Sequence, residues 1–141
     1  MTSYSPFLDV KDDTPGGRLK AARIAKHMYL IDLSTITGLC TRTIGLVESN
    51  KQIASPPTLR LLSKALDVPI SFLGCFEQLP ETTLGNRITK ARLYHGYTKR
   101  EFAKLLDVDV RTLFNWENDR FAPLDSHLNL LTSYLDIIMK E

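Results

Sequence analysis

The residues best suited to chemistry in this chain are arginines that return at a fixed spacing. Arg42 and Thr43 recur 69 positions later as Arg111 and Thr112, and Arg23 recurs as Arg92. For Arg42 and Arg111, recurrence at one relative position favours contact with a partner over two solvated surface arginines. Clustered basic residues attract polyanions, so the chemistry indicated is the binding of an anionic partner.

Other reactive side chains show no catalytic or metal-binding spacing. Cys40 and Cys75 are too far apart for a ligand or redox motif, which favours a reduced, cytoplasmic protein. The three histidines fall at unrelated positions. We find no phosphate loop, nucleophile elbow or paired carboxylates. The sequence therefore predicts no enzyme, no metal site and no cofactor.

The recurring arginines belong to a longer internal repeat. Residues 18–68 align with residues 87–137 without a gap. Identical pairs include Arg18/Arg87, Ala22/Ala91, Arg23/Arg92, Arg42/Arg111, Thr43/Thr112, Glu48/Glu117, Leu59/Leu128, Leu62/Leu131 and Asp67/Asp136. We infer two copies of one small domain, at 17–76 and 86–141, with a tail at 1–16 and a linker at 77–85.

Composition sets the class of protein, and charge differs between its parts. The chain has 141 residues, 43% hydrophobic and 24% charged, so a folded chain is expected. No run approaches the roughly 20 apolar residues that cross a bilayer, so membrane spanning and secretion are not expected. The net charge of +2 divides into −2 for the tail, +5 for the first copy, −2 for the linker and +1 for the second copy.

The second copy reads as four short helices. Gly96 ends the first, and Thr98 with Glu101 forms a capping box for the next. Asp109 can cap a helix over 110–117, which Asn118 and Asp119 can end. A longer apolar pattern after Pro123 predicts the last helix.

The first copy shows the same order of helix signals as the second. Gly38 breaks its second helix from its third, and Ser55-Pro56-Pro57 opens its fourth. Residues 68–73 add a short fifth helix. No β pattern occurs, so the sequence predicts an all-α protein of two domains with four to five helices each.

This arrangement resembles the Cro/Xre-type (lambda-repressor-like) helix-turn-helix family. In the second copy the resemblance is carried by 98–103, 108–113 and Trp116-Glu117. In the first it is carried by Arg18-Leu19, Ala22-Arg23, Leu33-Ser34, Gly38, Thr43-Ile44, Glu48 and 59–68. Together the two copies cover all but the tail and the linker.

The resemblance implies that helices 41–48 and 110–117 enter the major groove of double-stranded DNA. It gives base contacts in the second copy to Arg111 with guanine, Asn115 with adenine, and Val110 and Phe114 with thymine methyl groups. Phosphate contacts fall to Lys99, Thr112 and Arg120, and Thr98 is also expected to contact the DNA. The matching residues of the first copy are Thr41, Arg42, Gly45 and Leu46 for bases, with Thr43 and Lys51 for phosphate. Trp116 is expected in the core, and Glu48 and Glu117 are expected to serve structure.

The first copy departs from the family where its second helix begins. Met28-Tyr29-Leu30-Ile31 stands opposite Tyr97-Thr98-Lys99-Arg100, and exposed apolar residues there would signal a protein partner. This favours the second copy as the reader of sequence, whereas the +5 charge favours the first. Nonspecific phosphate affinity from the first copy would reconcile the two.

The resemblance implies a sequence-specific transcriptional regulator of a bacterium, phage or mobile element, acting as a repressor. The alternative is a protein-interaction module, antitoxin-like or an anti-repressor partner, that uses Leu30 and Ile31 for assembly. A homodimer through Tyr134, Leu135, Ile138 and Met139 also stays open, as does direct or inverted order of the two copies on DNA.

Overall fold

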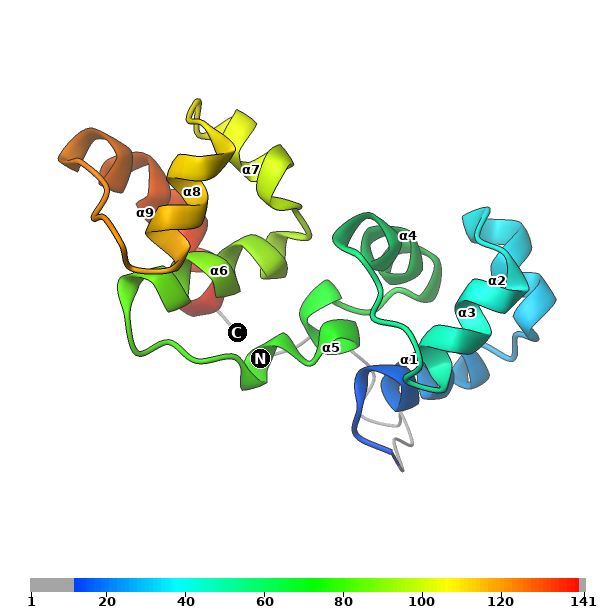
Figure 1. The fold of residues 1–141 in the computed structure, drawn as a ribbon. Coiled ribbons are helices and arrows are strands. Elements are labelled where there is room, and N and C mark those ends of the chain that lie inside the picture. The colour runs from blue at the N-terminus through cyan, green and yellow to red at the C-terminus, as the bar shows by residue number, and fades with distance from the viewer. Residues whose placement is uncertain (1–11, 140–141) are drawn as a thin grey trace. The chain divides into compact units, whose positions relative to one another are not determined.

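The computed structural model describes residues 12–139, and within that range it contains nine α-helices, one 3₁₀-helix and no strand (Figure 1). The predicted all-α class is confirmed. Residues 1–11, most of the expected tail, lie outside the described residues.

The chain forms two compact units that divide between Glu77 and Gln78. The first, called domain 1, contains α1 (Pro15–Ala25), α2 (Leu30–Thr37), α3 (Thr41–Glu48), α4 (Pro56–Leu66) and α5 (Ile70–Gly74). The second, domain 2, contains α6 (Leu84–His95), α7 (Lys99–Leu105), α8 (Val110–Glu117) and α9 (Asp125–Met139). The 3₁₀-helix Phe76–Gln78 spans the division.

Two helices begin earlier than the sequence boundaries anticipate. Thr14 caps α1 by accepting the amide of Gly17 at 3.1 Å, and Thr83 caps α6 by accepting the amide of Asn86 at 3.0 Å. The last residues of the expected tail and linker are therefore helical, because each segment carries its own threonine cap.

The helix ends follow the predicted signals. Gly38 and Gly96 adopt φ of 78° and 79°, the left-handed region that glycine enters without strain. Ser55 caps α4 and Asp109 caps α8. Helices 41–48 and 110–117 accordingly have the predicted bounds.

Each domain buries its own apolar core. In domain 1 the core draws on Leu19, Leu33, Ile44 and Leu62, and in domain 2 on Ile88, Phe102, Leu113, Trp116 and Leu131. Trp116 is 4% exposed, which confirms its predicted place in the core. Pairs such as Leu33 and Phe102 lie at equivalent repeat positions, so the two cores follow one pattern.

The last helix of domain 2 packs inward along most of its length. Tyr134 and Leu135 contact the core, Ile138 is buried, and Met139 is 77% exposed. Of the four residues expected at a dimer surface, only Met139 is mainly exposed. The helical repeat directs the other three toward α6, the helix against which α9 packs.

No single helix among residues 12–139 is long and apolar enough to cross a membrane. Helices α2 and α3 pass that test only when taken together, and they are bent by 117° where they join. This angle falls within the roughly 90–120° typical of a helix-turn-helix.

Candidate nucleic-acid interface

A buried ion pair fixes the third helix of each domain. Arg23 bonds Glu48 through Nε–Oε2 at 2.7 Å and Nη2–Oε1 at 3.0 Å. At the equivalent positions, Arg92 bonds Glu117 at 2.7 and 3.2 Å. The Glu48 carboxylate holds the pKa of Arg23 above its ordinary value. The predicted structural role of both glutamates is thus confirmed.

The same two arginines also hold the start of the second helix. Arg23 donates from Nη1 to the Met28 carbonyl at 2.8 Å, and Arg92 donates to the Tyr97 carbonyl at 2.9 Å. One guanidinium therefore ties three segments together: the first helix, the turn before the second, and the end of the third. This orients the third helix relative to the helix that precedes it.

A second matched contact joins the start of the first helix to the end of the third. The Gly16 amide donates to Asn50 Oδ1 at 2.9 Å, and the Gly85 amide donates to Asp119 Oδ1 at 2.9 Å. A Cβ on Gly16 would lie 2.4 Å from the Glu48 carbonyl oxygen. Glycine is required there because the backbones approach so closely.

The sequence alignment missed this contact because it began at Arg18. Thr14/Thr83 and Gly16/Gly85 also keep the spacing of 69 residues. Asn50 donates to Thr14 at 2.8 Å, and Thr83 donates to Asp119 at 2.6 Å. Extending the alignment upstream by four residues supplies the signal.

In domain 2 the second and third helices begin with strong caps. Thr98 accepts the amide of Glu101 at 3.1 Å, and Glu101 accepts the amide of Thr98 at 2.8 Å. Asp109 accepts the amide of Arg111 at 2.8 Å. The Thr98 hydroxyl therefore serves the cap, and its contact with DNA stays a prediction.

One face of α8 is turned to solvent. Val110, Arg111 and Phe114 are exposed, and Thr112 and Asn115 are half-buried. Leu113 and Trp116 occupy the opposite, buried face. The residues predicted to contact bases thus share one side of the helix or flank it, as the helical period requires.

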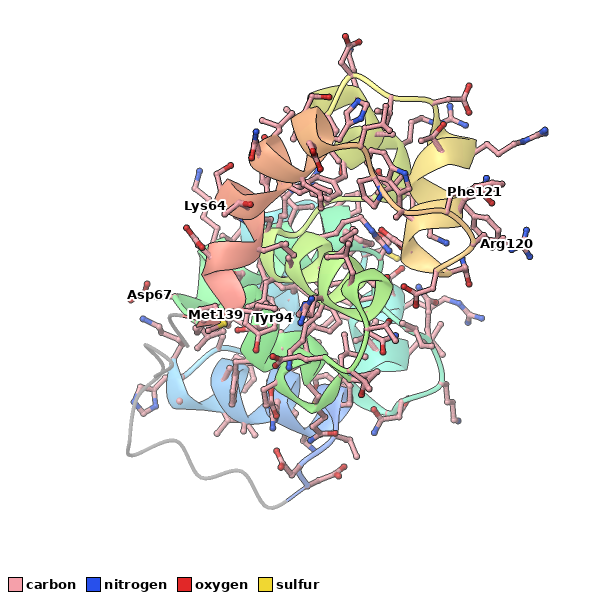
Figure 2. All side chains as sticks on the ribbon, turned by 90° about the vertical axis from the view of Figure 1, so that its left-hand side faces the viewer. Lys64, Asp67, Tyr94, Arg120, Phe121 and Met139 are labelled. Carbon is pink, nitrogen blue, oxygen red and sulfur yellow. The ribbon has the colours of Figure 1, made fainter. Side chains whose placement is uncertain are left out.

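Two predicted phosphate contacts lie against the aromatic ring of a third predicted DNA contact, Phe114. The Lys99 ammonium lies 5.1 Å from the centroid of the Phe114 ring, and the Arg120 guanidinium lies 5.2 Å from it. Both distances fit cation–π attraction. Figure 2 shows Arg120 and the neighbouring Phe121 beyond the end of α8. The arrangement gathers two positive charges around an exposed ring, beside Arg111.

The corresponding face of domain 1 is less basic and less bulky. Thr41, Arg42 and Lys51 are exposed, while Thr43 and Leu46 are half-buried. The Thr43 hydroxyl lies 3.0 Å from the Cys40 sulfur.

Gly45 takes the place of Phe114, and a Cβ built on Gly45 would meet no atom of residues 12–139 within 4 Å. Leu30 takes the place of Lys99. The aromatic ring and one of its two cations are therefore missing from domain 1.

The expectation that Leu30 and Ile31 are both exposed is only half right. Leu30 is half-buried and packs against the core of domain 1, whereas Ile31 is 61% exposed. As the first residue of α2, Leu30 lies three positions before the fully buried Leu33 and shares its face of the helix. Tyr29, the residue before α2, is 77% exposed and is the other exposed large side chain beside Ile31 in the sequence.

The net charge of each domain differs from the value expected from sequence when the chain is divided where the structure divides it, between Glu77 and Gln78. Residues 1–77 carry nine basic and seven acidic residues, a net +2, and residues 78–141 carry nine of each, a net 0. Arg18 pairs with Asp13 and Glu77, and Arg23 pairs with Glu48, so these two buried positive charges are already matched by carboxylates of domain 1. The larger positive charge of the first copy therefore does not measure a DNA-binding surface.

Among the described residues, no group of three or more His, Cys, Asp or Glu side chains is placed to hold a metal ion. The His127 ring lies against Trp116, 5.1 Å between centroids, which gives this histidine a packing contact within domain 2.

A family model described as helix-turn-helix matches the chain twice, at residues 19–73 and 88–137. The two matches cover more than half of the chain and coincide with the two sets of helices described above. Comparisons with curated proteins and with solved structures gave no match.

Proposed function

The chain belongs to the Cro/Xre-type helix-turn-helix family, a DNA-binding family, with two copies in tandem, and we propose that it is a sequence-specific repressor of transcription. The observation that carries the proposal is the exposed face of α8, where Lys99 and Arg120 flank Phe114 next to Arg111. Occupying a site is enough for repression, and no catalytic step is involved.

In this proposal domain 2 reads the sequence. Its helix α8 enters the major groove, where the Arg111 guanidinium bonds a guanine edge and Asn115 bonds an adenine. Val110 and Phe114 contact thymine methyl groups. Thr98, Lys99, Thr112 and Arg120 bind phosphates and fix the register. Because Lys99 and Arg120 are both drawn to the Phe114 ring, their charges are held close to the reading helix.

Domain 1 contributes affinity more than specificity. Its helix α3 presents Thr41, Arg42 and Leu46 to the groove, with Thr43 and Lys51 near the phosphates. Gly45 offers no side chain where domain 2 has Phe114, so fewer base contacts are available. Arg42 and Lys51 still supply attraction to the phosphate backbone, which is independent of sequence.

The experiment is selection of a binding motif from random duplexes, followed by salt titration on the selected site. Log affinity should fall with log salt by about 0.9 per phosphate neutralised. Arg111→Ala should relax preference at one base pair, at a cost of roughly 1–3 kcal/mol. Lys99→Ala should weaken binding to all sequences and reduce the salt slope by about 1.

Lys64→Ala is the matched control, because Lys64 is an exposed lysine on α4 (Figure 2) that the proposal assigns no contact. Its affinity and salt slope should equal those of the wild type. Absence of any binding at low salt across the random duplexes would overturn the proposal.

A second candidate function rests on the exposed apolar side chains of domain 1. Ile24, Tyr29, Ile31 and Ile36 are each more than half exposed, and such residues mark interaction sites when they cluster. In this alternative the domain assembles with a protein, as an antitoxin-like or anti-repressor partner. It predicts that Ile31→Asp abolishes a stoichiometric complex and that Arg42→Ala leaves DNA affinity unchanged.

A further inference from the structure

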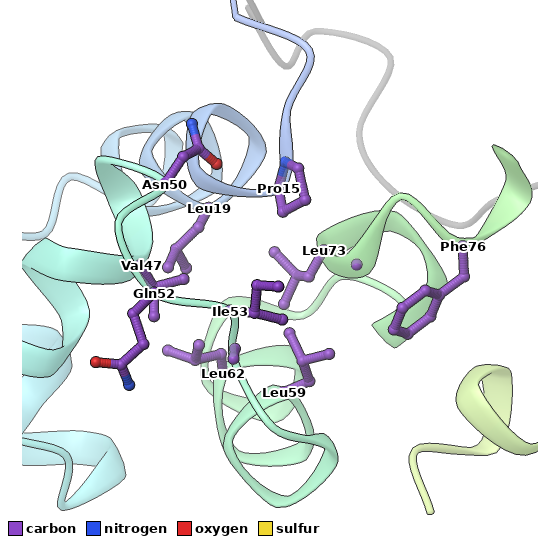
Figure 3. A pocket seen from close by; sticks show the side chains of 12 residues that line it. Pro15, Leu19, Val47, Asn50, Gln52, Ile53, Leu59, Leu62, Leu73 and Phe76 are labelled. Atoms are coloured by element: carbon purple, nitrogen blue, oxygen red, sulfur yellow. The ribbon is translucent and has the colours of Figure 1, made fainter. Parts of the chain in front are cut away.

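Domain 1 contains an apolar cleft of about 100 Å³ that the DNA-binding role does not use (Figure 3). Its walls come from α1, α3, α4 and α5, and its mouth lies at the loop that follows α3. The apolar walls include Leu19, Val47, Leu59, Leu62 and Leu73. At the mouth, the side chain of Ile53 is 95% exposed.

Comparison with domain 2 shows what is missing from this cleft. Val47 stands where domain 2 has Trp116, and both are 4% exposed. In domain 2 the indole belongs to a core that includes Ile88 and Leu131, which are the counterparts of Leu19 and Leu62. A two-ring side chain therefore packs where domain 1 has only a valine.

The polar groups at the cleft restrict what it can hold. Among residues 12–139, no charged residue lines it. Its polar amide side chains are those of Asn50 and Gln52, and the Asn50 amide is already engaged. Asn50 accepts from the Gly16 amide at 2.9 Å and donates to Thr14 at 2.8 Å. A charged ligand would lose its hydration without a partner, at a large cost in free energy. Apolar cavities of roughly 150 Å³ bind benzene-sized molecules.

We propose that this cleft binds a small, uncharged, apolar ring compound, of one ring or the size of indole. The compound takes the place that the Trp116 side chain occupies in domain 2. Binding removes apolar surface of the ligand and of the exposed Ile53 side chain from water, which is the driving force. Because the cleft is small, part of a two-ring ligand projects from its mouth.

The cleft also touches the end of α3. Val47 is part of that helix, and Asn50 joins its end to the start of α1 through Gly16. A ligand in contact with both residues alters the support of α3. We therefore expect it to change DNA affinity, a consequence that rests on the proposed function.

The experiment is a titration of the full chain with indole and with benzene, followed by methyl NMR. The Leu59 and Leu73 methyl signals should shift and saturate, while those of Leu113 in domain 2 stay unchanged. Ile53→Asp should weaken binding by roughly tenfold or more, because it places a charge at the mouth. Ile36→Asp is the matched control, since Ile36 is another exposed isoleucine of domain 1, outside the cleft.

Failure to saturate in the wild type would overturn the proposal, as would equal losses in the Ile53 and Ile36 variants. Val47→Phe gives a second readout, because it should block indole by filling the cleft from within. DNA affinity measured with and without indole should differ by roughly fivefold or more. Indole binding without any DNA binding would refute the proposed function and leave the cleft site standing. DNA binding unaffected by bound indole would refute only the coupling.

Discussion

Domains 1 and 2 share their internal supports and differ in the surface that those supports carry. Both use an arginine–glutamate pair at the end of the third helix, and both seat a glycine amide on an Asn or Asp side chain. The exposed positions diverge: Lys99 and Phe114 in domain 2 correspond to Leu30 and Gly45 in domain 1. The identical arginine–glutamate pair and glycine contact therefore hold the third helix in both domains, whereas the differences at these positions change the surface that the helix exposes.

Net charge does not distinguish the domains in the way their surfaces do. Counted by sequence boundaries, the first copy carries +5 and the second +1, but division at Glu77 reduces this to +2 and 0. Arg18 and Arg23 of domain 1 are buried and paired with carboxylates, as are Lys90 and Arg92 of domain 2. Lys99, Arg111 and Arg120 of domain 2 lie at the exposed face. When a partner contacts only one face of a domain, the position of the charged side chains matters more than the net charge of the domain.

The largest expected effect tests whether the supports are equivalent. Arg92→Ala leaves the Glu117 carboxylate buried without its partner, and the side chains are 8% and 3% exposed. Loss of one partner from a buried pair costs roughly 3–5 kcal/mol. Domain 2 should therefore be strongly destabilised in thermal unfolding, and Arg23→Ala should do the same to domain 1.

The two unfolding events can be followed separately. The single tryptophan, Trp116, is buried in domain 2 and reports its unfolding by fluorescence. Buried Cys75 reports domain 1 by thiol labelling when Cys40 is replaced by Ser. The double variant Arg92→Met/Glu117→Leu should recover most of the loss, because apolar residues can replace a buried pair. A small effect of Arg92→Ala would show that this pair does not support α8.

The next effect concerns the glycines. Gly16→Ala and Gly85→Ala each place a Cβ against two carbonyl oxygens, at 2.4–2.5 Å and at 2.6 Å. Forcing backbones apart should cost each domain roughly 1–3 kcal/mol. Gly45→Ala is the contrast, since its Cβ meets nothing and alanine favours the helix by roughly 0.5–1 kcal/mol. Urea denaturation would measure the three changes in the free energy of unfolding. A change of the same sign for all three substitutions would contradict the close approach seen at Gly16 and Gly85 but not at Gly45.

The helix bounds and much of what holds the third helices could be predicted, because the sequence signals for them are local or occur in both copies. The bounds of α3 and α8 follow from neighbouring caps and breaks, and a structural role is expected for Glu48 and Glu117, which can bond a helix end or a basic residue. The cluster of Lys99, Phe114 and Arg120 could not be predicted, since it joins residues from two helices and a loop. Arg18 and Arg87 show the converse: the residues are identical, yet Arg18 is buried and Arg87 is exposed.

A smaller effect separates the caps of the third helices. Cys40 precedes α3 where Asp109 precedes α8, and the Asp109 carboxylate accepts the amide of Arg111. The hydrogen bond with Thr43 lowers the pKa of the Cys40 thiol, which favours the thiolate at this helix start. Cys40→Asp should stabilise domain 1 by about 1 kcal/mol, measured by urea denaturation at pH 7. No gain over Cys40→Ala would mean that the two caps are not equivalent.

The smallest effect is a pH dependence confined to domain 1. Hydrogen bonds from Arg18 hold the pKa values of Asp13 and Glu77 below their ordinary values of 3.8 and 4.5. A lowered folded pKa adds stability above the ordinary pKa, and this stability is lost as pH falls through the lowered value. Asp13 and Glu77 are 65% and 42% exposed, so the contribution lies within the roughly 0–1 kcal/mol of exposed pairs.

Glu77→Gln should accordingly lower the unfolding midpoint of domain 1 at pH 7, and this difference should shrink as the pH falls below about 4. The counterpart of Arg18 in domain 2 is Arg87, which is exposed. Arg87→Gln should therefore leave the unfolding transition reported by Trp116 nearly unchanged, both at pH 7 and below pH 4. A loss from Glu77→Gln that stays constant with pH would mean that the carboxylate acts through packing. The identical arginines would then differ in burial but not in electrostatic role.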